Sequence, residues 1–426
     1  MTRGAAMRWS RAQWSWAMAD WAREPFFTIV LSLVFPPYFV AVVAADPVRG
    51  TALWGYGLAA ASALLVFLGP LAGAAADSTG RRKPWVLGCV VAAALALVSL
   101  WAATSVPGQI LWVLASCALA QLAIELSRVF TDSMVLQAAP RERVGELSGV
   151  AVGLGFAASM LYIGGTFVFE GASARAISAL CGLWLVVFFL PLLLWCPDYP
   201  GEARGWEASR RDSIARLRNS LRDLMRVPQV GRFLLARMIY WDGMMGLFSF
   251  IAILASSRLE WRASELSAFG LLGLFAGAAG GFFGGILDRR HGSKRPLMGA
   301  LVIMLAVSIA MLLQLPDSVE RAADAKLFSS PGDFTFLAMA VLASAGLGTL
   351  LACSRSMMVR LSPADRLGEF FGLYVMVGRA SSFAAPLLVA VATTAFANQA
   401  TGVFGVALTF MSLGLMLLGR VHEPAR

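Results

Sequence analysis

Two short basic loops, 211 residues apart, decide how this chain is organised. The first is GAAADSTGRRKP, residues 73–84, and the second is GGILDRRHGSKRP, residues 284–296. Each lies between two long apolar runs and combines an aspartate with a glycine hinge and several basic residues. A loop of this kind at equivalent places indicates a membrane protein with two similar halves. The candidate gate residues in these loops are Gly73, Asp77, Gly80, Arg81 and Arg82, and Gly284, Asp288 and Gly292.

The composition indicates that water is not the main solvent of this protein. The chain is 58% hydrophobic and only 14% charged, with a mean hydropathy of +0.72, whereas soluble domains average about 25% charged residues. Apolar runs of about 20 residues can cross a bilayer as helices. We therefore predict an all-α membrane protein with twelve transmembrane segments, at 24–45, 52–76, 85–104, 109–137, 146–168, 175–196, 233–256, 265–287, 297–315, 334–358, 369–395 and 401–419.

The distribution of positive charge predicts the orientation. If the N-terminus is cytoplasmic and the loops alternate, 25 of the 35 Lys and Arg residues lie on the cytoplasmic side, six on the other side, and four within segments. Basic residues concentrate on the side that is not translocated. We expect both termini in the cytoplasm, no signal peptide, and a bacterial inner (plasma) membrane as the location. The net charge of +10 then reflects topology and not a nucleic-acid partner.

A second internal repeat supports the duplication. PRERVGELSG, residues 140–149, follows the fourth segment, and PADRLGEFFG, residues 363–372, follows the tenth. Their shared glutamates, Glu146 and Glu369, join the gate candidates. The predicted organisation is an N-terminal six-helix half, a cytoplasmic linker and a C-terminal six-helix half, at residues 1–196, 197–232 and 233–426.

The linker itself allows two interpretations. Residues 213–225 place apolar side chains at helical spacing against an arginine-rich face. They fit an amphipathic helix on the inner membrane surface or a solvated basic linker.

The sequence resembles a known superfamily and one of its branches. The loop at residues 73–84 is similar to the pattern G-x-L-A-D-[RK]-x-G-R-[RK] of the major facilitator superfamily, with Ala75 and Ser78 as departures. Over nearly its full length the chain resembles the vacuole effluxer-like branch of that superfamily, also called the unknown major facilitator family. Four stretches carry the resemblance to this branch. They are DWA at 20–22; Glu125 with Phe130 and Asp132; FLLA at 233–236 with YWDG at 240–243; and SRS at 354–356 with EFFGLY at 369–374 and Pro386.

That resemblance implies a secondary transporter with the major facilitator fold. Its eukaryotic relatives are associated with amino-acid efflux from the vacuole. Arg23, Glu24 and Asp132 depart from the family pattern and add charge near the expected pathway.

The fourth segment holds the clearest mechanistic signal. Gln121, Glu125, Arg128 and Asp132 recur at steps of 4, 3 and 4, which places them on one helix face. A charge near the bilayer centre costs about 2.5–3.5 kcal/mol on insertion scales, so this face must meet protein or water. It either lines a transport pathway or forms a self-satisfied ladder that fixes segment four to a neighbour.

The resemblance implies which other side chains face a central cavity. Segments one, four, seven and ten line that cavity in the superfamily, which implies a place there for Tyr240 and Asp242, as for Glu125 and Arg128, and Asp20 opens segment one. Arg379 of segment eleven would close an ion pair across the two halves. Asp242 and Glu125 are the candidates for a carboxylate that binds a coupling proton.

The resemblance also implies a gate. Asp77 would meet the start of segment eleven near Gly368, with Arg128 or Arg143 as a basic partner, and Asp288 would meet segment five near Gly145. Arg355, near the end of segment ten, would belong to the same gate.

Segments one and eight have unusual compositions. Pro25 and Pro36-Pro37 interrupt the first. The eighth carries seven glycines, which either pack tightly or let segments two and eight pack across the two-fold and slide.

Nothing in the sequence indicates an enzyme, a cofactor or a metal site. No nucleophile elbow or phosphate loop is present, the two histidines fall outside the segments, and the five cysteines contain no CxxC pair. The function expected is secondary active transport of a small organic solute, an amino acid or related metabolite being a candidate, coupled to protons, by a monomer in the lipid bilayer. The alternatives are a drug-efflux carrier and a non-transporting receptor or scaffold on a carrier fold.

The charge distribution makes a direct prediction about topology. Cysteines introduced at Ser213 in the linker and Ser318 in the loop after segment nine should react with a membrane-impermeant maleimide from opposite sides of the membrane. Labelling of both from one side would contradict the twelve-segment topology.

Overall fold

The computed structural model describes residues 9–106, 108–140, 143–168, 173–198, 227–315, 327–363 and 367–423. The regular elements in these ranges are all helical, and twelve of the helices are long and apolar enough to cross a membrane. The predicted amphipathic helix at 213–225 and both maleimide positions lie outside the described residues. The elements are α1 (Arg11–Pro25), η1 (Phe26–Val34), α2 (Phe35–Tyr38), η2 (Phe39–Val43), α3 (Pro47–Thr79), α4 (Lys83–Ser99), η3 (Leu100–Ala102), α5 (Gln109–Ser133), α6 (Val135–Ala138), α7 (Val144–Val168), α8 (Ala174–Trp195), α10 (Pro228–Arg258), α11 (Ala263–His291), α12 (Lys294–Gln314), α13 (Pro331–Leu361), α14 (Leu367–Ala380), α15 (Ala384–Phe396) and α16 (Gln399–Gly419).

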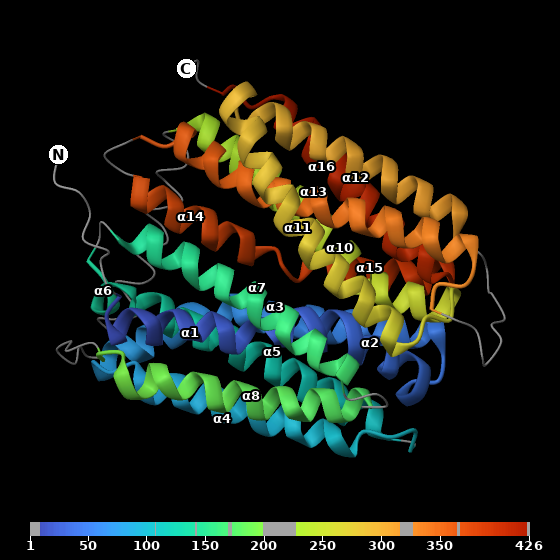
Figure 1. Cartoon of the computed structure of the whole chain (residues 1–426), viewed down its shortest axis with the longest axis horizontal. Coiled ribbons are helices and arrows are strands. Elements are labelled where there is room, and N and C mark those ends of the chain that lie inside the picture. The colour runs from blue at the N-terminus through green and yellow to red at the C-terminus, as the bar shows by residue number, and fades with distance from the viewer. Residues whose placement is uncertain are drawn as a thin grey trace.

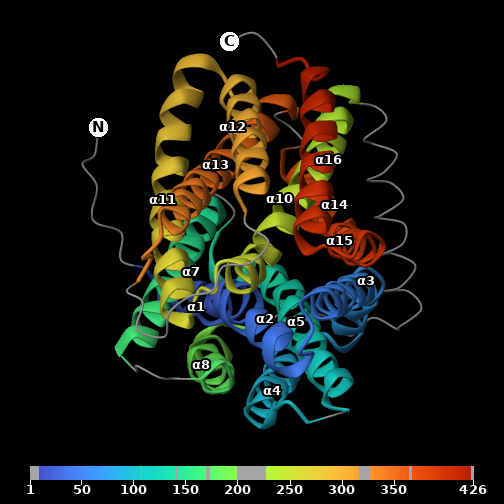
Figure 2. The ribbon, with the colours of Figure 1, turned by 90° about the vertical axis from the view of Figure 1, so that its right-hand side faces the viewer.

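The helices form two bundles that lie one against the other (Figure 1). The N-terminal half contains α1 to α8, and the C-terminal half contains α10 to α16; Figure 2 shows the first half below the second, with α3, α4 and α8 seen nearly end-on. Equivalent helices pack together in both halves: α1 on α8 matches α10 on α16, and α4 on α5 matches α12 on α13. This repeated packing confirms the twelve-helix, two-half architecture that the internal repeats predicted.

The two halves touch through equivalent helix pairs, α3 with α15 and α7 with α11. Segment two (α3) and segment eight (α11) therefore each pack against a helix of the opposite half. We call the end of the molecule where α1 begins and α16 ends the basic end, and the opposite end the far end. Polar contacts between the two halves occur at the far end. There Thr166 Oγ1 lies 3.2 Å from Ser267 Oγ, and Gln399 Nε2 donates to the Pro47 carbonyl at 2.7 Å. Because α3 packs along α15 but only slightly on α14, the halves diverge toward the basic end (Figure 1).

The first membrane helix begins earlier than the sequence predicted. We expected it to start at residue 24, but helical structure runs from Arg11 through Val43, and Ser10 with Gln13 forms a capping box at its start. The polar residues Asp20, Arg23 and Glu24 made this stretch unlike an apolar span. Their charges are paired inside the protein, so Asp20 lies well within the helix instead of opening it, and Arg23 does not belong to the cytoplasmic segment.

Proline disrupts this first helix in a specific way. Pro25 has no N–H to donate to the carbonyl of Trp21, four residues earlier. The indole Nε1 of Trp184 in α8 donates to that carbonyl at 3.2 Å, and the two indole rings stack with centroids 6.0 Å apart. Beyond Pro25 the backbone is π-helical over Phe26–Val34. The Trp21 carbonyl, which has no helical donor because of Pro25, is thus used for a hydrogen bond between α1 and α8.

Segment eleven is broken where the sequence predicted one helix. It consists of α14 and α15, separated by a turn at residues 381–383. Pro386 explains the turn, because it has no N–H for the carbonyl of Ser382. Beyond the turn, α15 packs closely on α3 of the N-terminal half. The contact is so close that a Cβ at Gly55 of α3 would come within 2.8 Å of the Pro386 carbonyl oxygen. Segment four also ends earlier than predicted, at Ser133, with the short helix α6 behind it.

Most glycines of segment eight serve close packing of α11 on α13. A Cβ on Gly280 would overlap the carbonyl of Ala345, and one on Gly348 would overlap the carbonyl of Gly277. Such backbone approach is possible only between small residues. Gly270 instead faces Leu33 and Ile163 of the other half. Packing within the half therefore accounts for much of the glycine pattern.

The α11–α13 contact can be tested by adding single methyl groups. Gly280→Ala should lower the free energy of unfolding by about 1–3 kcal/mol because the methyl group has no room. Gly285→Ala, whose Cβ would meet open space, should be neutral or stabilising by up to about 1 kcal/mol. Unfolding of the purified variants in detergent measures both. Equal effects of the two substitutions would contradict the packing.

Candidate functional site

Seven charged side chains from three helices gather between the two halves. Helix α5 contributes acids and a base on one face, as its 4, 3 and 4 spacing predicted, and α1 and α14 complete the cluster. We call it the central charge network: Asp20, Arg23, Glu24, Glu125, Arg128, Asp132 and Arg379. Glu125 is residue 17 of the 25-residue α5, so the network lies within the membrane-spanning part.

Two pairs of the network belong to the N-terminal half alone. Arg23 Nη2 donates to Asp20 Oδ1 at 2.5 Å, and its Nη1 donates to Thr131 Oγ1 at 2.7 Å. Arg128 Nη2 lies 3.7 Å from Glu24 Oε2, and its guanidinium covers the Phe27 ring at 5.4 Å. Both pairs join α1 to α5 or extend along α1, so they hold the N-terminal half together.

The third group crosses from one half to the other. Arg379 Nη2, at the end of α14, lies 3.8 Å from Glu125 Oε2 and 3.8 Å from Asp132 Oδ2. The cross-half ion pair that the sequence suggested for Arg379 is therefore present. Besides the charges that α5 itself carries, this face therefore meets partners from α1 and from the opposite half.

Gln121, the fourth member of the α5 face, takes no part in the network. Its Nε2 donates to Ser62 Oγ of α3 at 3.1 Å. It therefore fixes α5 to α3 within the N-terminal half.

A second polar cluster lies inside the C-terminal half. The Arg237 guanidinium stacks on the Tyr374 ring at 3.7 Å and faces the Trp241 ring at 5.0 Å, while Nη1 donates to the Tyr374 carbonyl at 3.3 Å. The Tyr374 hydroxyl bonds with Ser354 Oγ at 2.6 Å. Gly378 gives the guanidinium its space, since a Cβ there would come within 2.6 Å of Nη1. This cluster fixes α14 to α10 and α13.

Asp242 and Tyr240 belong to the second cluster and not to the central charge network. Asp242 is 3% exposed and lies near enough to Arg237, itself 6% exposed, to be affected by its positive charge. Tyr240 is 0% exposed and packs against Gly414 of α16. The sequence placed both on the central cavity, whereas the structure buries both in the C-terminal half.

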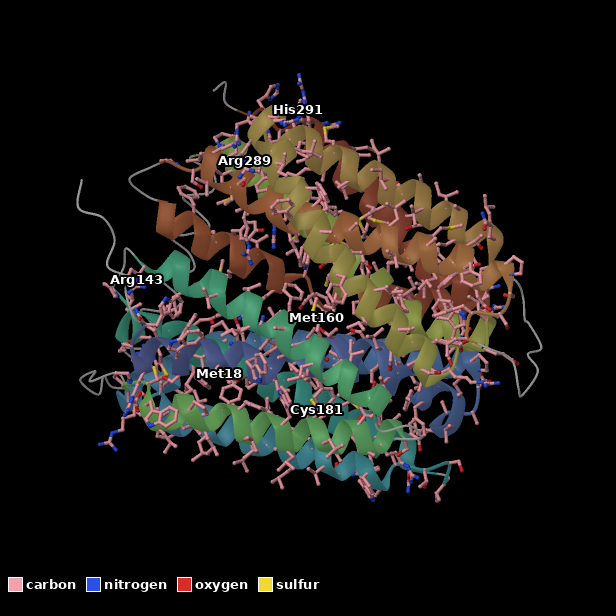
Figure 3. The ribbon with its side chains drawn as sticks, viewed as in Figure 1. Met18, Arg143, Met160, Cys181, Arg289 and His291 are labelled. Atoms are coloured by element: carbon pink, nitrogen blue, oxygen red, sulfur yellow. The ribbon has the colours of Figure 1, made fainter. Side chains whose placement is uncertain are left out.

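The glycine hinges of the two basic loops have the backbone that the sequence predicted. Gly80 ends α3 at φ +66° and Gly292 ends α11 at φ +84°, a left-handed conformation that favours glycine at helix C-termini. Gly73 faces open space, and Gly284 packs on Thr349. Arg143 and Arg289, from the two halves, both lie toward the basic end (Figure 3). The side chains of Asp77, Glu146 and Glu369 lie outside the described residues.

Asp288 has partners within its own half. Ser293 Oγ donates to its Oδ1 at 2.5 Å, and Arg360 Nη2 lies 3.2 Å from the same oxygen. These contacts join α11, α12 and α13. The expected partner, the start of segment five near Gly145, includes side chains outside the described residues, so that contact stays a prediction. Arg360 takes the position expected for Arg355, whose side chain is exposed.

Two carboxylates near the ends of the halves were missed by the sequence reasoning. Glu423 accepts from the backbone N–H groups of Ser293 and Lys294 at 2.8 and 3.0 Å and lies 3.2 Å from Arg360 Nη1. Asp198 accepts from the backbone N–H groups of Arg82 and Lys83 at 2.9 and 3.4 Å. In each half an acid after the sixth helix thus caps the third. Alignment of the two halves at an offset of 225 residues would have revealed this pair.

Metal binding finds no support in the described part of the chain, where no group of three or more His, Cys, Asp or Glu side chains could hold an ion. Ionisable groups within membrane-spanning helices are costly, which makes the central charge network a candidate for a pathway of solutes or protons.

Sequence comparison identifies the family. A profile described as "Vacuole effluxer Atg22 like" matches residues 142–425. The chain therefore belongs to the vacuole effluxer Atg22-like family. Among curated relatives, an uncharacterized MFS-type transporter of Bacillus subtilis, YxiO, is 26% identical over 98% of this chain and 96% of its own length. Autophagy-related protein 22-1 of Aspergillus fumigatus is 22% identical over 60% of this chain and 43% of its own length.

Solved structures show the same fold. The inward open xylose transporter XylE from E. coli matches 96% of both chains with a TM-score of 0.67 at 12% identity. A bacterial homologue of the lysosomal transporter Spinster, inward-facing and unoccupied, matches 97% of this chain and 98% of its own with a TM-score of 0.67 at 15% identity. The chain is a multi-pass membrane protein with the fold of the major facilitator superfamily, and its relatives indicate an MFS-type transporter.

The Glu423 cap makes a local prediction. Glu423→Ala removes two acceptors from the first turn of α12 and should cost about 1–2 kcal/mol of local stability. Hydrogen exchange at Ser293 and Lys294 should accelerate accordingly. His422→Ala is the matched control, because the His422 side chain is exposed and its backbone N–H makes the contact with Gln229. Unchanged exchange in Glu423→Ala would contradict the capping role.

Proposed function

We propose that this protein is a secondary active transporter that moves a small organic solute by alternating access and is coupled to protons. The observation that carries the proposal is the central charge network, which lies between two halves of a carrier fold. Its side chains are partly accessible: those of Arg379 and Glu125 are 29% and 19% exposed, and that of Asp132 is 49% exposed. Charges that only fixed helix packing would be expected to be fully enclosed and hydrogen-bonded.

The contacts between the halves support the alternating-access part. The halves meet at the far end through pairs such as Thr166–Ser267 and diverge toward the basic end. A carrier of this architecture opens to the other side when such contacts break and the halves rock about the central site. The charge distribution of the sequence assigns the basic end to the cytoplasm, so the arrangement corresponds to an inward-facing state.

The substrate class follows from the family resemblance, which places amino acids and related metabolites first. Polar walls with both signs of charge suit a small polar or zwitterionic solute better than an apolar drug. We therefore favour a metabolite carrier over a drug-efflux carrier.

Transport in proteoliposomes tests the proposal. Radiolabelled amino acids, sugars and drugs should be screened for counterflow and for accumulation driven by an imposed proton gradient. We expect at least one polar metabolite to accumulate above protein-free liposomes, and a protonophore to abolish that accumulation. A screen in which no solute exceeds the protein-free level would contradict the function.

A reversible cross-link tests the alternating access itself. In a background without the five native cysteines, Thr166→Cys with Ser267→Cys should form a disulfide that holds the far end shut. Oxidation should abolish counterflow, and reduction should restore it. Either single cysteine serves as the control, and full counterflow in the oxidised double variant would exclude movement at this contact.

A further inference from the structure

The pairing within the central charge network is uneven. Asp20 has Arg23, and Glu24 has Arg128, each one carboxylate to one guanidinium. Glu125 and Asp132, in contrast, share the single guanidinium of Arg379. The network therefore holds four carboxylates and three guanidiniums, and Glu125 and Asp132 are the two carboxylates that share one ion-pair partner.

The contacts of Arg379 show that it does not saturate either carboxylate. Both N–O distances are 3.8 Å, which exceeds hydrogen-bond length. Glu125 Oε2 is buried from solvent and makes no hydrogen bond among the described residues. By comparison, the Arg23–Asp20 pair is a hydrogen bond of 2.5 Å. One arginine nitrogen thus lies loosely between two acids that each have unused hydrogen-bonding capacity.

A surplus negative charge inside a membrane protein needs a neutralising cation, because burial of an unpaired charge is costly. The charged groups that face the pair come from α1 (Asp20, Arg23 and Glu24), α5 (Arg128) and α14 (Arg379). All of these groups belong to the central charge network, whose four carboxylates and three guanidiniums sum to one negative charge when all are ionised.

We propose that Glu125 and Asp132 form the binding site for the coupling proton and hold one exchangeable proton between them, with Arg379 competing for the same oxygens. This inference rests on the proposed transport function and assigns its coupling site. Binding converts one carboxylate to a carboxylic acid, which removes one of the two charges that attract Arg379. Proton binding therefore weakens the tie between the halves, and proton release strengthens it.

A proton fits the site better than a metal ion. Between them, Glu125 and Asp132 supply only two carboxylates, and Arg379 lies 3.8 Å from an oxygen of each, in the place that a shared cation would need. The described residues also contain no third acid or histidine that completes a metal site. A proton needs only one oxygen and a path for water.

Accessibility distinguishes this pair from Asp242. Asp132 and Glu125 have side chains that are 49% and 19% exposed, so water can reach them. Asp242 is 3% exposed, and the nearby Arg237 is 6% exposed, so water reaches neither side chain freely. The Glu125–Asp132 pair is therefore better placed for proton exchange than Asp242.

The backbone at Arg379 allows its distance from the pair to change. Arg379 lies in the last turn of α14, directly before the break at 381–383. Because α15 is packed on α3 of the opposite half while α14 touches α3 only slightly, α14 can move about this break. The competition between Arg379 and the proton is thus linked to a movable helix.

Infrared difference spectroscopy of the purified protein in nanodiscs tests the site without knowledge of the solute. A pH titration should show one carboxylic C=O band that appears as the pH falls. Glu125→Gln and Asp132→Asn should each remove it, whereas Asp132→Glu and the exposed control Asp46→Asn should keep it. Arg379→Ala should double the titrating band, because both acids then lack a counter-charge, and Arg379→Lys should leave one.

Three results would overturn the assignment. The first is a band that persists in both Glu125→Gln and Asp132→Asn. The second is a band that disappears only in Asp242→Asn, which would place the proton in the C-terminal cluster. The third is a band that weakens when NaCl replaces choline chloride at constant pH, which would make the site one for Na⁺. Since the titration needs no solute, loss of the transport function with an intact band would leave the proton site standing.

Discussion

The fold depends on how charge is kept inside a membrane protein. Seven ionisable side chains lie between two apolar bundles, where an unpaired charge would strongly oppose insertion. They are tolerated because each guanidinium faces at least one carboxylate from α1 or α5. The pairing determines which helices lie together at the centre, and it explains why polar residues occur on α1, α5 and α14. Breaks in these helices near Pro25 and Pro386 place the charged residues beside flexible backbone.

The two polar clusters have different characters. The cluster around Arg237 is enclosed, stacked between aromatic rings and confined to the C-terminal half. The central charge network is partly accessible and crosses from one half to the other. Both reach α14 close to the α14–α15 break, one through Tyr374 and Gly378 and the other through Arg379. The enclosed cluster is thus suited to position α14, and the accessible one to respond to what enters between the halves.

Much of the fold could be predicted from the sequence, because hydropathy and internal repeats report directly on membrane helices. The cross-half pair of Arg379 was an expectation from the family resemblance, and its partners lie on the charged face of α5. The start of α1 was predicted wrongly because Asp20, Arg23 and Glu24 are polar in sequence but paired in space. The break after α14 was missed because its cause, Pro386, lies several residues beyond the turn.

Long-range polar contacts were the least predictable part of the site. Glu423 and Asp198 follow apolar helices and look like ordinary solvated ends, yet each caps a helix more than a hundred residues away. The central positions of Tyr240 and Asp242 were expected from the family resemblance, whereas this structure buries both side chains in the C-terminal half. The roles of the gate residues and of the proton pathway stay predictions.

The central claim is that protonation of the Glu125–Asp132 pair loosens the tie between the halves through Arg379. Spin labels at Ala380 in α14 and Leu136 in α6, both exposed, would report the distance between the halves by double electron–electron resonance. The distribution should shift to longer distances as the pH falls, and Arg379→Ala should give the low-pH distribution at every pH. A wild-type distribution that does not change with pH, or that Arg379→Ala does not alter, would contradict the account.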